Sequence, residues 1–202
     1  MSKSVIILGA GGHGKVVMDI VRCSGDTVLG FLDDAPPGET FMGLPVLGGC
    51  GEYPRWPEAC FVIAVGSGAV RQRLARAMEG VRWYTAIHPR AVVSPLETFI
   101  GQGSVVMANA VINPGAKIGA HSIINTSAVV EHDSCVGDFV HVSVGAKLAG
   151  NVTVGHRAWI GIGAVVSNNL TVCADCTLGA GAVVVRDLRE PGTYVGVPAE
   201  KL

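Results

Sequence analysis

An aliphatic residue recurs at every sixth position through the second half of the chain. Fifteen consecutive positions of this series hold Ile, Val or Leu: Ile100, Val106, Ile112, Ile118, Ile124, Val130, Val136, Val142, Leu148, Val154, Ile160, Val166, Val172, Leu178 and Val184. The residue four positions after each of them is usually small, as at Ser104 and Ala110. An α-helix would turn residues six apart away from a common face. The period instead predicts a triangular coil of three hexads, in which each residue stacks on the one 18 positions later.

These hexads predict a parallel β-helix for the C-terminal domain, residues 88–202. Fifteen hexads at three per coil give about five coils, with neighbouring strands about 4.8 Å apart. Glycine often follows the aliphatic residue. We expect these glycines to supply the positive φ angles of tight corners: Gly101, Gly119, Gly137, Gly155, Gly161 and Gly179.

The composition is that of a folded protein without a broad charged surface. The chain has 202 residues, 49% of them hydrophobic, and a formal net charge of -1, so it lacks the basic surface that nucleic acid requires. The first residues contain no long apolar segment, and no later stretch approaches ~18 uninterrupted apolar residues. We therefore expect a cytoplasmic protein that binds neither nucleic acid nor membrane, with its 6 cysteines reduced.

A second pattern predicts a small N-terminal α/β domain, Rossmann-like and nucleotide-binding, over residues 1–87. Residues 4–8 form an apolar run typical of a buried strand, and residues 15–23 have helical periodicity. Between them lies Gly9-Ala10-Gly11-Gly12-His13-Gly14, whose glycines let backbone amides approach a phosphate at a helix N-terminus. An acidic pair follows about 20 residues later, as a ribose ligand would. A third apolar run, residues 61–65, ends at another glycine. The candidate substrate-binding residues are Gly11, Gly12, His13, Gly14, Asp33, Asp34, Gly66 and Ser67.

Two interpretations of the glycine motif remain open. Its form matches dinucleotide-binding proteins, but roughly 85 residues hold only one half of a dinucleotide fold, which favours a nucleoside diphosphate over NAD. Alternatively, the glycines only permit close packing of a helix against a strand. The acidic pair Asp33-Asp34 and the loop at Gly66 favour a ligand.

Several short segments, distributed over nearly the whole chain, together match the sequence pattern of a known family. They are Gly9-Ala10-Gly11-Gly12-His13-Gly14, Phe31-Leu32-Asp33-Asp34, Ala64-Val65-Gly66, His88-Pro89, Asn125-Thr126, Glu131-His132-Asp133, His141-Val142-Ser143-Val144-Gly145-Ala146 and Ala149-Gly150-Asn151-Val152. With them the chain resembles the nucleotide-4-amino-sugar N-acetyltransferases of bacterial surface-glycan and glycoprotein pathways, a family that includes sialic-acid O-acetyltransferase-like proteins. The resemblance implies a left-handed β-helix, a homotrimer, and acetyl-CoA bound between adjacent helices. The family often has Asn-Asn where this chain has Ser67-Gly68. A contact that these asparagines would make to the base or ribose of the nucleotide is therefore not expected here.

An imidazole next to a carboxylate offers the chemistry that acetyl transfer needs. The reaction requires a base for the proton of the amine and donors for the developing oxyanion. His132 can serve as the base, with Asp133 holding its tautomer. Gly150 lies 18 residues after His132 and is therefore expected one coil away, with its N–H near the imidazole. The resemblance implies these catalytic roles for His132, Asp133 and Gly150, and acetyl-CoA contacts for His141, Gly150, Ile162 and Ala180.

These residues predict direct transfer from acetyl-CoA to the amine of a nucleotide-linked 4-amino-4,6-dideoxy sugar, with no metal and no acyl-enzyme. The resemblance favours a UDP-linked sugar of the bacillosamine type, with GDP- and dTDP-linked sugars as alternatives. An O-acetyltransferase acting on sialic acid is a further alternative, although free sialic acid gives the N-terminal domain no ligand. A non-catalytic nucleotide-binding protein would bind no CoA. A γ-class carbonic anhydrase does not fit the spacing of His121, His132, His141 and His156.

Overall fold

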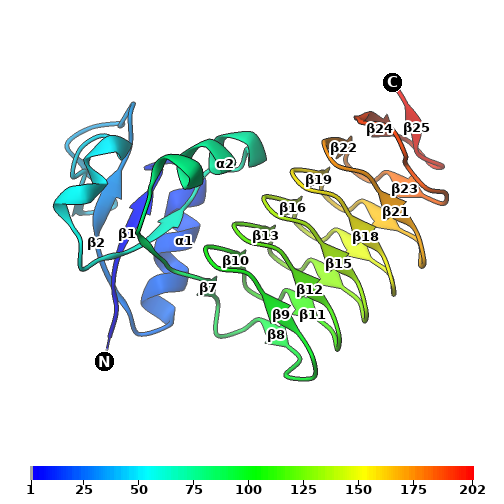
Figure 1. Cartoon of the computed structure of the whole chain (residues 1–202), viewed down its shortest axis with the longest axis horizontal. Helices are drawn as coiled ribbons and strands as arrows, with labels where there is room; N and C mark the ends of the chain where they lie inside the picture. The colour runs from blue at the N-terminus through cyan, green and yellow to red at the C-terminus, as the bar shows by residue number, and fades with distance from the viewer. Residues whose placement is uncertain (1) are drawn as a thin grey trace.

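The computed structural model describes residues 2–202 and divides into an α/β domain and a β-helix (Figure 1). The coils of the β-helix run from this domain toward the C-terminus. The elements of the α/β domain are β1 (Ser4–Leu8), α1 (Gly12–Cys23), β2 (Thr27–Leu32), β3 (Thr40–Phe41), β4 (Leu44–Pro45), the 3-10 helix η1 (Cys50–Arg55), β5 (Cys60–Ile63), α2 (Gly68–Ala77) and β6 (Arg82–Trp83). The predicted fold, a Rossmann-like domain followed by a left-handed parallel β-helix, is confirmed.

The α/β domain is built on a parallel sheet with the strand order β2-β1-β5-β6. Val5 and Ile7 of β1 pack in the same core as α1, whereas Ile6 and Leu8 pack in the core that includes Leu74 of α2. Both faces of β1 are therefore covered, which explains its continuous apolar run. The carboxyl ends of β1 and β5 meet at one edge of the sheet, where the two glycine loops begin.

The β-helix consists of three sheets, which we call faces 1, 2 and 3. Face 1 contains β7 (Ala86–Ile87), β10 (Val105–Val106), β13 (Ile123–Ile124), β16 (His141–Val142), β19 (Trp159–Ile160), β22 (Cys176–Leu178), β24 (Gly192–Val195) and the antiparallel β25 (Glu200–Lys201). Face 2 contains β8 (Val92–Val93), β11 (Val111–Ile112), β14 (Val129–Val130), β17 (Lys147–Leu148), β20 (Val165–Val166) and β23 (Val183–Val184). Face 3 contains β9 (Phe99–Ile100), β12 (Lys117–Ile118), β15 (Cys135–Val136), β18 (Thr153–Val154) and β21 (Thr171–Val172).

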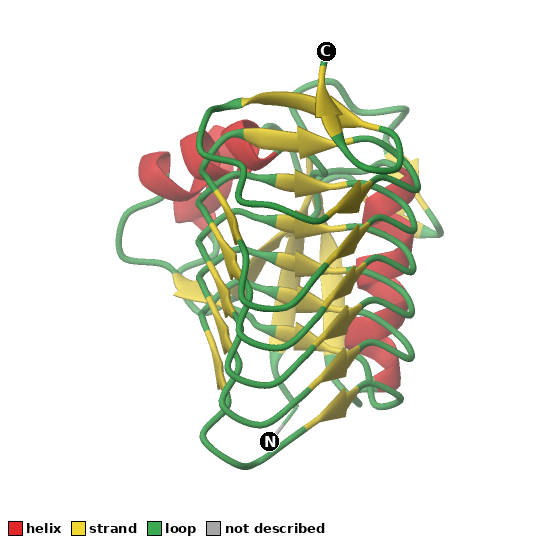
Figure 2. Cartoon of the chain, turned by 90° about the vertical axis from the view of Figure 1, so that its right-hand side faces the viewer, coloured by secondary structure: helices red, strands yellow, loops and turns green. Residues whose placement is uncertain are grey.

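The predicted register of 18 residues per coil is confirmed, and Figure 2 shows the coils stacked in order. Val106 pairs with Ile124, and Ile124 pairs with Val142. The aliphatic residue of each hexad points inward, and small residues such as Ala110 and Ala128 fill the remaining core. Side chains at equivalent positions of successive coils therefore form columns.

The glycines that follow the aliphatic residues do not have the predicted role. Positive φ angles occur two positions later along the hexads, for example at Gly103 (72°), Asn109 (59°) and Asp133 (60°). A Cβ placed on Gly119 would lie 2.5 Å from the carbonyl carbon of Gly137 in the next coil. The prediction of positive φ was therefore wrong: at these positions glycine is required because neighbouring coils approach too closely for a side chain.

The β-helix begins within the segment expected to belong to the first domain. Strand β7 at Ala86–Ile87 already pairs with β10, before the expected boundary at residue 88. At the other end, β24 and β25 close the last coil. Among residues 2–202, no helix combines the length and the apolar character needed to cross a bilayer.

The α/β domain is attached to face 1. Val17 and Val21 of α1 share a hydrophobic core with Ala86, Val105 and Ile123 of the β-helix. Figure 1 shows α1 between the parallel sheet and the first coils. The glycine loops are thus held against one side of the β-helix.

Candidate active site

His132 lies at the corner that joins face 2 to face 3. Its side chain is 61% exposed, and its Nδ1 lies 2.8 Å from Asp133 Oδ2. A carboxylate can only accept a hydrogen bond, so Nδ1 donates and the neutral ring carries its lone pair on Nε2. The hydrogen bond to Asp133 also raises the pKa of His132 above its usual value. The predicted pair therefore has the geometry of an oriented base.

Gly150 is the neighbour of His132 in the next coil, as the register predicts. A Cβ placed on Gly150 would lie 2.5 Å from His132 Nε2. The amide of Asn151 donates to the carbonyl oxygen of His132 over 2.9 Å, whereas the Gly150 amide has no acceptor within residues 2–202. A hollow of about 330 Å³ adjoins His132 and Asp133. Gly150, with its unpaired N–H, thus lies next to the free imidazole nitrogen, while the hollow lies against His132 on the side of the earlier coils.

The glycine motif divides into packing residues and open residues. A Cβ on Gly14 would collide with the carbonyl oxygen of Gly9, and one on Gly9 would lie 2.9 Å from Ala64 O. Gly14, predicted to bind substrate, is therefore a buried packing residue. Gly11 and Gly12 have open space where a side chain would be. They lie at the N-terminus of α1, where backbone amides attract phosphate.

The two acidic residues also differ in role. Both carboxylate oxygens of Asp33 accept backbone hydrogen bonds, from Ala10 at 2.7 Å and from Ala35 at 2.9 Å. Asp33 therefore holds the glycine loop against the end of β2. Asp34 uses Oδ1 to accept from the Cys50 amide at 2.7 Å, and the residues described offer no donor to its Oδ2. Asp34 is thus the more available of the two for a ligand.

The loop after β5 is held in place by an arginine that sequence reasoning did not select. Ser67 caps α2, accepting from the Val70 amide at 3.4 Å. Arg71 is 1% exposed, and its guanidinium donates to the carbonyl oxygens of five residues in the loop and in two coils: Val65, Gly66, His121, Phe139 and Val140. The sequence contained one signal that Arg71 is buried. It lies three residues before the apolar Leu74, and residues three apart share one face of a helix.

His141 is buried beneath the α/β domain and is remote from the corner of His132. It is 8% exposed, and its Nε2 lies 3.0 Å from Asn125 Nδ2. Burial, together with the charge of Arg71, lowers the pKa of His141 and of His13 to about 4. Both rings are therefore neutral at pH 7, and each keeps one buried nitrogen without a partner, Nε2 of His13 and Nδ1 of His141. The histidine of the glycine motif thus belongs to the domain junction.

Ile162 and Ala180 lie together at the corner that joins face 1 to face 2. Ile162 is 61% exposed, and its carbonyl oxygen accepts from the Gly181 amide at 2.8 Å. Val144 occupies the same column one coil earlier. The expected acetyl-CoA residues are therefore divided between this corner, the buried His141 and the corner of Gly150.

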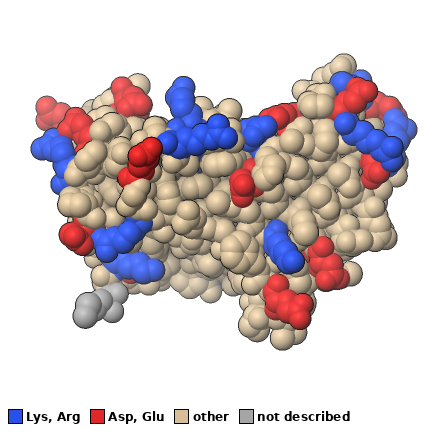
Figure 3. All heavy atoms as spheres, in the orientation of Figure 1, with Lys and Arg blue, Asp and Glu red and all other residues tan. Residues whose placement is uncertain are grey.

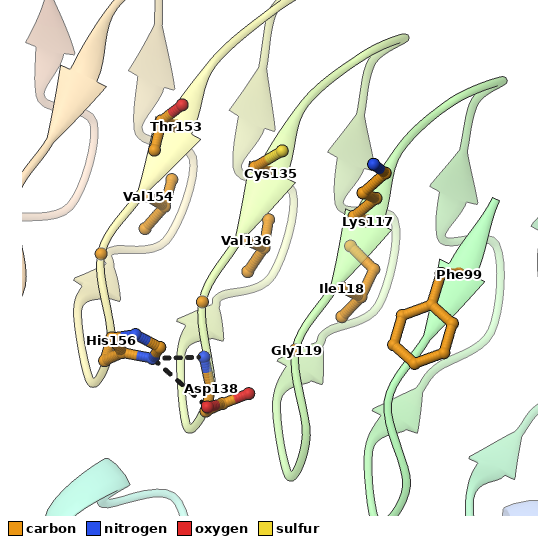
Figure 4. Close-up of a pocket in the computed structure, with 12 residues that line it drawn as sticks. Phe99, Lys117, Ile118, Gly119, Cys135, Val136, Asp138, Thr153, Val154 and His156 are labelled. Carbon is orange, nitrogen blue, oxygen red and sulfur yellow. Dashed lines mark hydrogen bonds and ion pairs between the residues drawn. The ribbon is translucent and has the colours of Figure 1, made fainter. Parts of the chain in front are cut away.

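A larger hollow elsewhere on the β-helix contains none of the expected site residues. It has a volume of about 390 Å³ and lies on face 3 (Figure 4). Lys117, Cys135 and Thr153 line it in one column, and His156 accepts from the Asp138 amide at its edge. Hollow size alone therefore does not identify the site.

The surface offers one group of side chains with metal-ligand chemistry among the residues described. Asp19, Cys23 and His88 bring their ligand atoms within 4.8 Å of one another. His88 Nδ1 accepts from the Arg90 amide, which occupies one ring nitrogen. Charged residues of both signs are scattered over the face of the molecule in Figure 3.

Two families of known proteins match successive parts of the chain. Residues 4–78 match the PglD N-terminal domain, and residues 97–132 match the bacterial transferase hexapeptide of six repeats. The acetyltransferase domain of PglB from Neisseria gonorrhoeae FA1090 is 38% identical, with 100% of both chains covered and a TM-score of 0.93. The chain belongs to the PglD-like family of hexapeptide-repeat acetyltransferases.

Other members of this family have been solved with ligands. PerB from Caulobacter crescentus, in complex with CoA and GDP-perosamine, is 40% identical over 98% of this chain and 97% of that chain, with a TM-score of 0.92. UDP-N-acetylbacillosamine N-acetyltransferase from Bacillus subtilis is 41% identical over 115 residues, 52% of this chain. The chain spans at most about half the length of the curated relatives that it matches. The predicted family is confirmed, and its members include nucleotide-sugar N-acetyltransferases.

Proposed function

We propose that this protein transfers the acetyl group of acetyl-CoA to the amine of a nucleotide-linked 4-amino-4,6-dideoxy sugar. The observation that carries the proposal is the corner at His132, where a free Nε2, an oriented imidazole and an unpaired Gly150 N–H meet. A relative that holds CoA and GDP-perosamine supports the two ligand classes. The open glycines of the N-terminal loop support the nucleotide.

In the proposed reaction the neutral amine attacks the thioester carbonyl carbon. His132 Nε2 accepts the proton that the amine loses, and Asp133 stabilises the resulting imidazolium. The Gly150 N–H donates to the carbonyl oxygen as it becomes negative. When the carbon–sulfur bond breaks, the CoA sulfur takes the proton from His132. The sugar leaves as its acetamide, and no cysteine or metal enters the reaction.

A homotrimer completes this site. Face 2 presents a mostly valine surface through its outward residues: Val92, Val111, Val129, Lys147, Val165 and Val183. The corner of Ile162 borders one side of this face and the corner of His132 borders the other. Three copies packed with face 2 toward a common axis would bring the corner of His132 in each subunit against the corner column that contains Val144 and Ile162 in the next. The nucleotide loops and Ile162 of one subunit would then meet the base of its neighbour.

The decisive experiment is an acetylation assay with a defined panel of acceptors. The acceptors are UDP-, GDP- and dTDP-linked 4-amino-4,6-dideoxy sugars, together with free sialic acid, and mass spectrometry identifies each product. We expect acetyl-CoA-dependent N-acetylation of at least one nucleotide-linked sugar and no reaction with sialic acid. Acetylation of sialic acid alone would replace the proposed function with O-acetylation.

A further inference from the structure

Trp159 is a large apolar side chain that remains 38% exposed at the edge of the domain junction. It is the outward residue of β19 on face 1. The outward residues of earlier strands on this face, Val105 and Ile123, are covered by the α/β domain and are 1% and 0% exposed. Trp159 therefore lies where this cover ends, so that part of its indole faces open space.

Its neighbours belong to both halves of the proposed site. A Cβ placed on Gly66, in the loop after β5, would lie 3.7 Å from Trp159 Cη2. The indole also contacts the ring of His141, with centroids 4.7 Å apart and planes at 40°. Three residues further on, the chain reaches the exposed Ile162. Trp159 thus lies between the nucleotide loop and the corner proposed for CoA.

The substrate of the proposed function has one part that must occupy this intermediate position. The nucleotide is held at one end and the amine reacts at the other, so the hexose ring lies between them. An indole offers a flat, polarisable apolar surface. The C–H groups on one face of a hexose can pack on that surface while the ring hydroxyls stay free at the edges.

Polar partners for a further hydroxyl are scarce around the indole. The Gly66 carbonyl oxygen already accepts from Arg71 at 2.7 Å, and His141 Nε2 is bonded to Asn125. The other ring nitrogen of His141, Nδ1, has no partner among the residues described, but it is enclosed by protein atoms and offers no exposed surface to a ligand. A hydroxyl buried without a partner loses its hydrogen bonds to water, whereas a methyl group gains from burial. The surroundings of Trp159 therefore favour a methyl group at C6.

We propose that Trp159 is the platform for the hexose ring and that it selects 6-deoxy sugars over sugars with a 6-hydroxyl group. This inference rests on the proposed function. An apolar site discriminates against an added hydroxyl by up to roughly 10²-fold, so the wild-type protein should prefer the 6-deoxy substrate by roughly 10- to 100-fold in kcat/KM.

The test compares Trp159→Ala with Trp159→Phe on 6-deoxy and 6-hydroxy forms of the same nucleotide-linked 4-amino sugar. In Trp159→Ala we expect KM for the 6-deoxy sugar to rise roughly 10- to 100-fold and the preference at C6 to fall below about 3-fold. Trp159→Phe retains an aromatic surface and should keep most of the preference. Thr177→Ala, at the same position of the next coil, is the matched control and should behave as wild type.

Calorimetry with the unsubstituted nucleoside diphosphate and with CoA completes the test. Both affinities should stay within about 2-fold of wild type in Trp159→Ala, since neither ligand contains the hexose. Weaker binding of either one, or an unchanged preference at C6, would overturn the platform while leaving acetyl transfer intact. If the wild-type protein acetylated none of the sugars, the proposed function would fail as well.

Discussion

At the scale of the residue, the proposed reaction depends on whether His132 is neutral. Its pKa is raised by the hydrogen bond from Nδ1 to Asp133, so the ring becomes protonated, and inactive as a base, at a higher pH than an ordinary histidine. We expect kcat/KM to fall as pH drops through a value above 6.5. Asp133→Asn removes the carboxylate, lowers the pKa and should move this fall to lower pH. A pH–rate profile of both proteins measures the shift.

His132→Ala removes the base altogether. Turnover should fall by roughly 10²- to 10⁴-fold, and Asp133→Asn should cost less. The affinity for acetyl-CoA, measured by calorimetry, should stay nearly unchanged in both variants. Near-normal turnover of His132→Ala across the pH range would mean that water accepts the proton.

Gly150 is expected to tolerate no side chain next to the imidazole. Its Cβ would lie 2.5 Å from His132 Nε2, so Gly150→Val must displace the base or occupy the place of the thioester. A displacement of about 1 Å can cost roughly 10²-fold in rate, and we expect a loss of at least that size in kcat. Nucleotide binding should survive, because the loop at Gly12 is in the other domain. Full activity of Gly150→Val would contradict the placement of the thioester beside Gly150.

At the scale of the element, Arg71 joins α2 to the β-helix. Its charged guanidinium is buried and has no carboxylate partner among the described residues. This burial lowers the pKa of Arg71 to about 10. Arg71→Leu leaves several buried carbonyl oxygens without donors and should lower the free energy of unfolding by about 3 kcal/mol or more. Urea denaturation measures the change. Arg76→Leu, exposed on the same helix, should stay within about 0.5 kcal/mol of wild type, and equal midpoints for the two variants would contradict the role of Arg71.

The elements differ in how far the sequence could predict them. The hexads predicted the coils because inward residues such as Ile124 and Ala128 recur every six positions, which is also the spacing of the strands in a coil. The same register predicted that Gly150 would lie beside His132. The different fates of Gly11 and Gly14 could not be predicted, since one residue type serves both open loops and tight packing. The burial of His141 also depended on how the domains dock, which no local pattern records.

At the scale of the whole molecule, the proposed site requires more than one chain. Val165 is the outward residue of β20 on face 2, so Val165→Glu places a charge where three copies would meet, and a buried unpaired charge is costly. We expect light scattering to show a trimer for the wild type and smaller species for the variant, with a matching loss of turnover. Thr153→Glu, on face 3, should leave the trimer intact. A fully active monomer would contradict the shared site.

The hydrogen bonds of Arg71 to the β-helix have a consequence for how the sequences of such proteins diverge in evolution. Arg71 donates its hydrogen bonds to the coils only to main-chain oxygens, those of His121, Phe139 and Val140. Every residue supplies a carbonyl oxygen, so substitutions at these three positions leave the hydrogen bonds of Arg71 in place. The contact of Arg71 between the two domains therefore produces no covarying pair of side chains. One arginine is held constant, while the coils beneath it remain free to diverge.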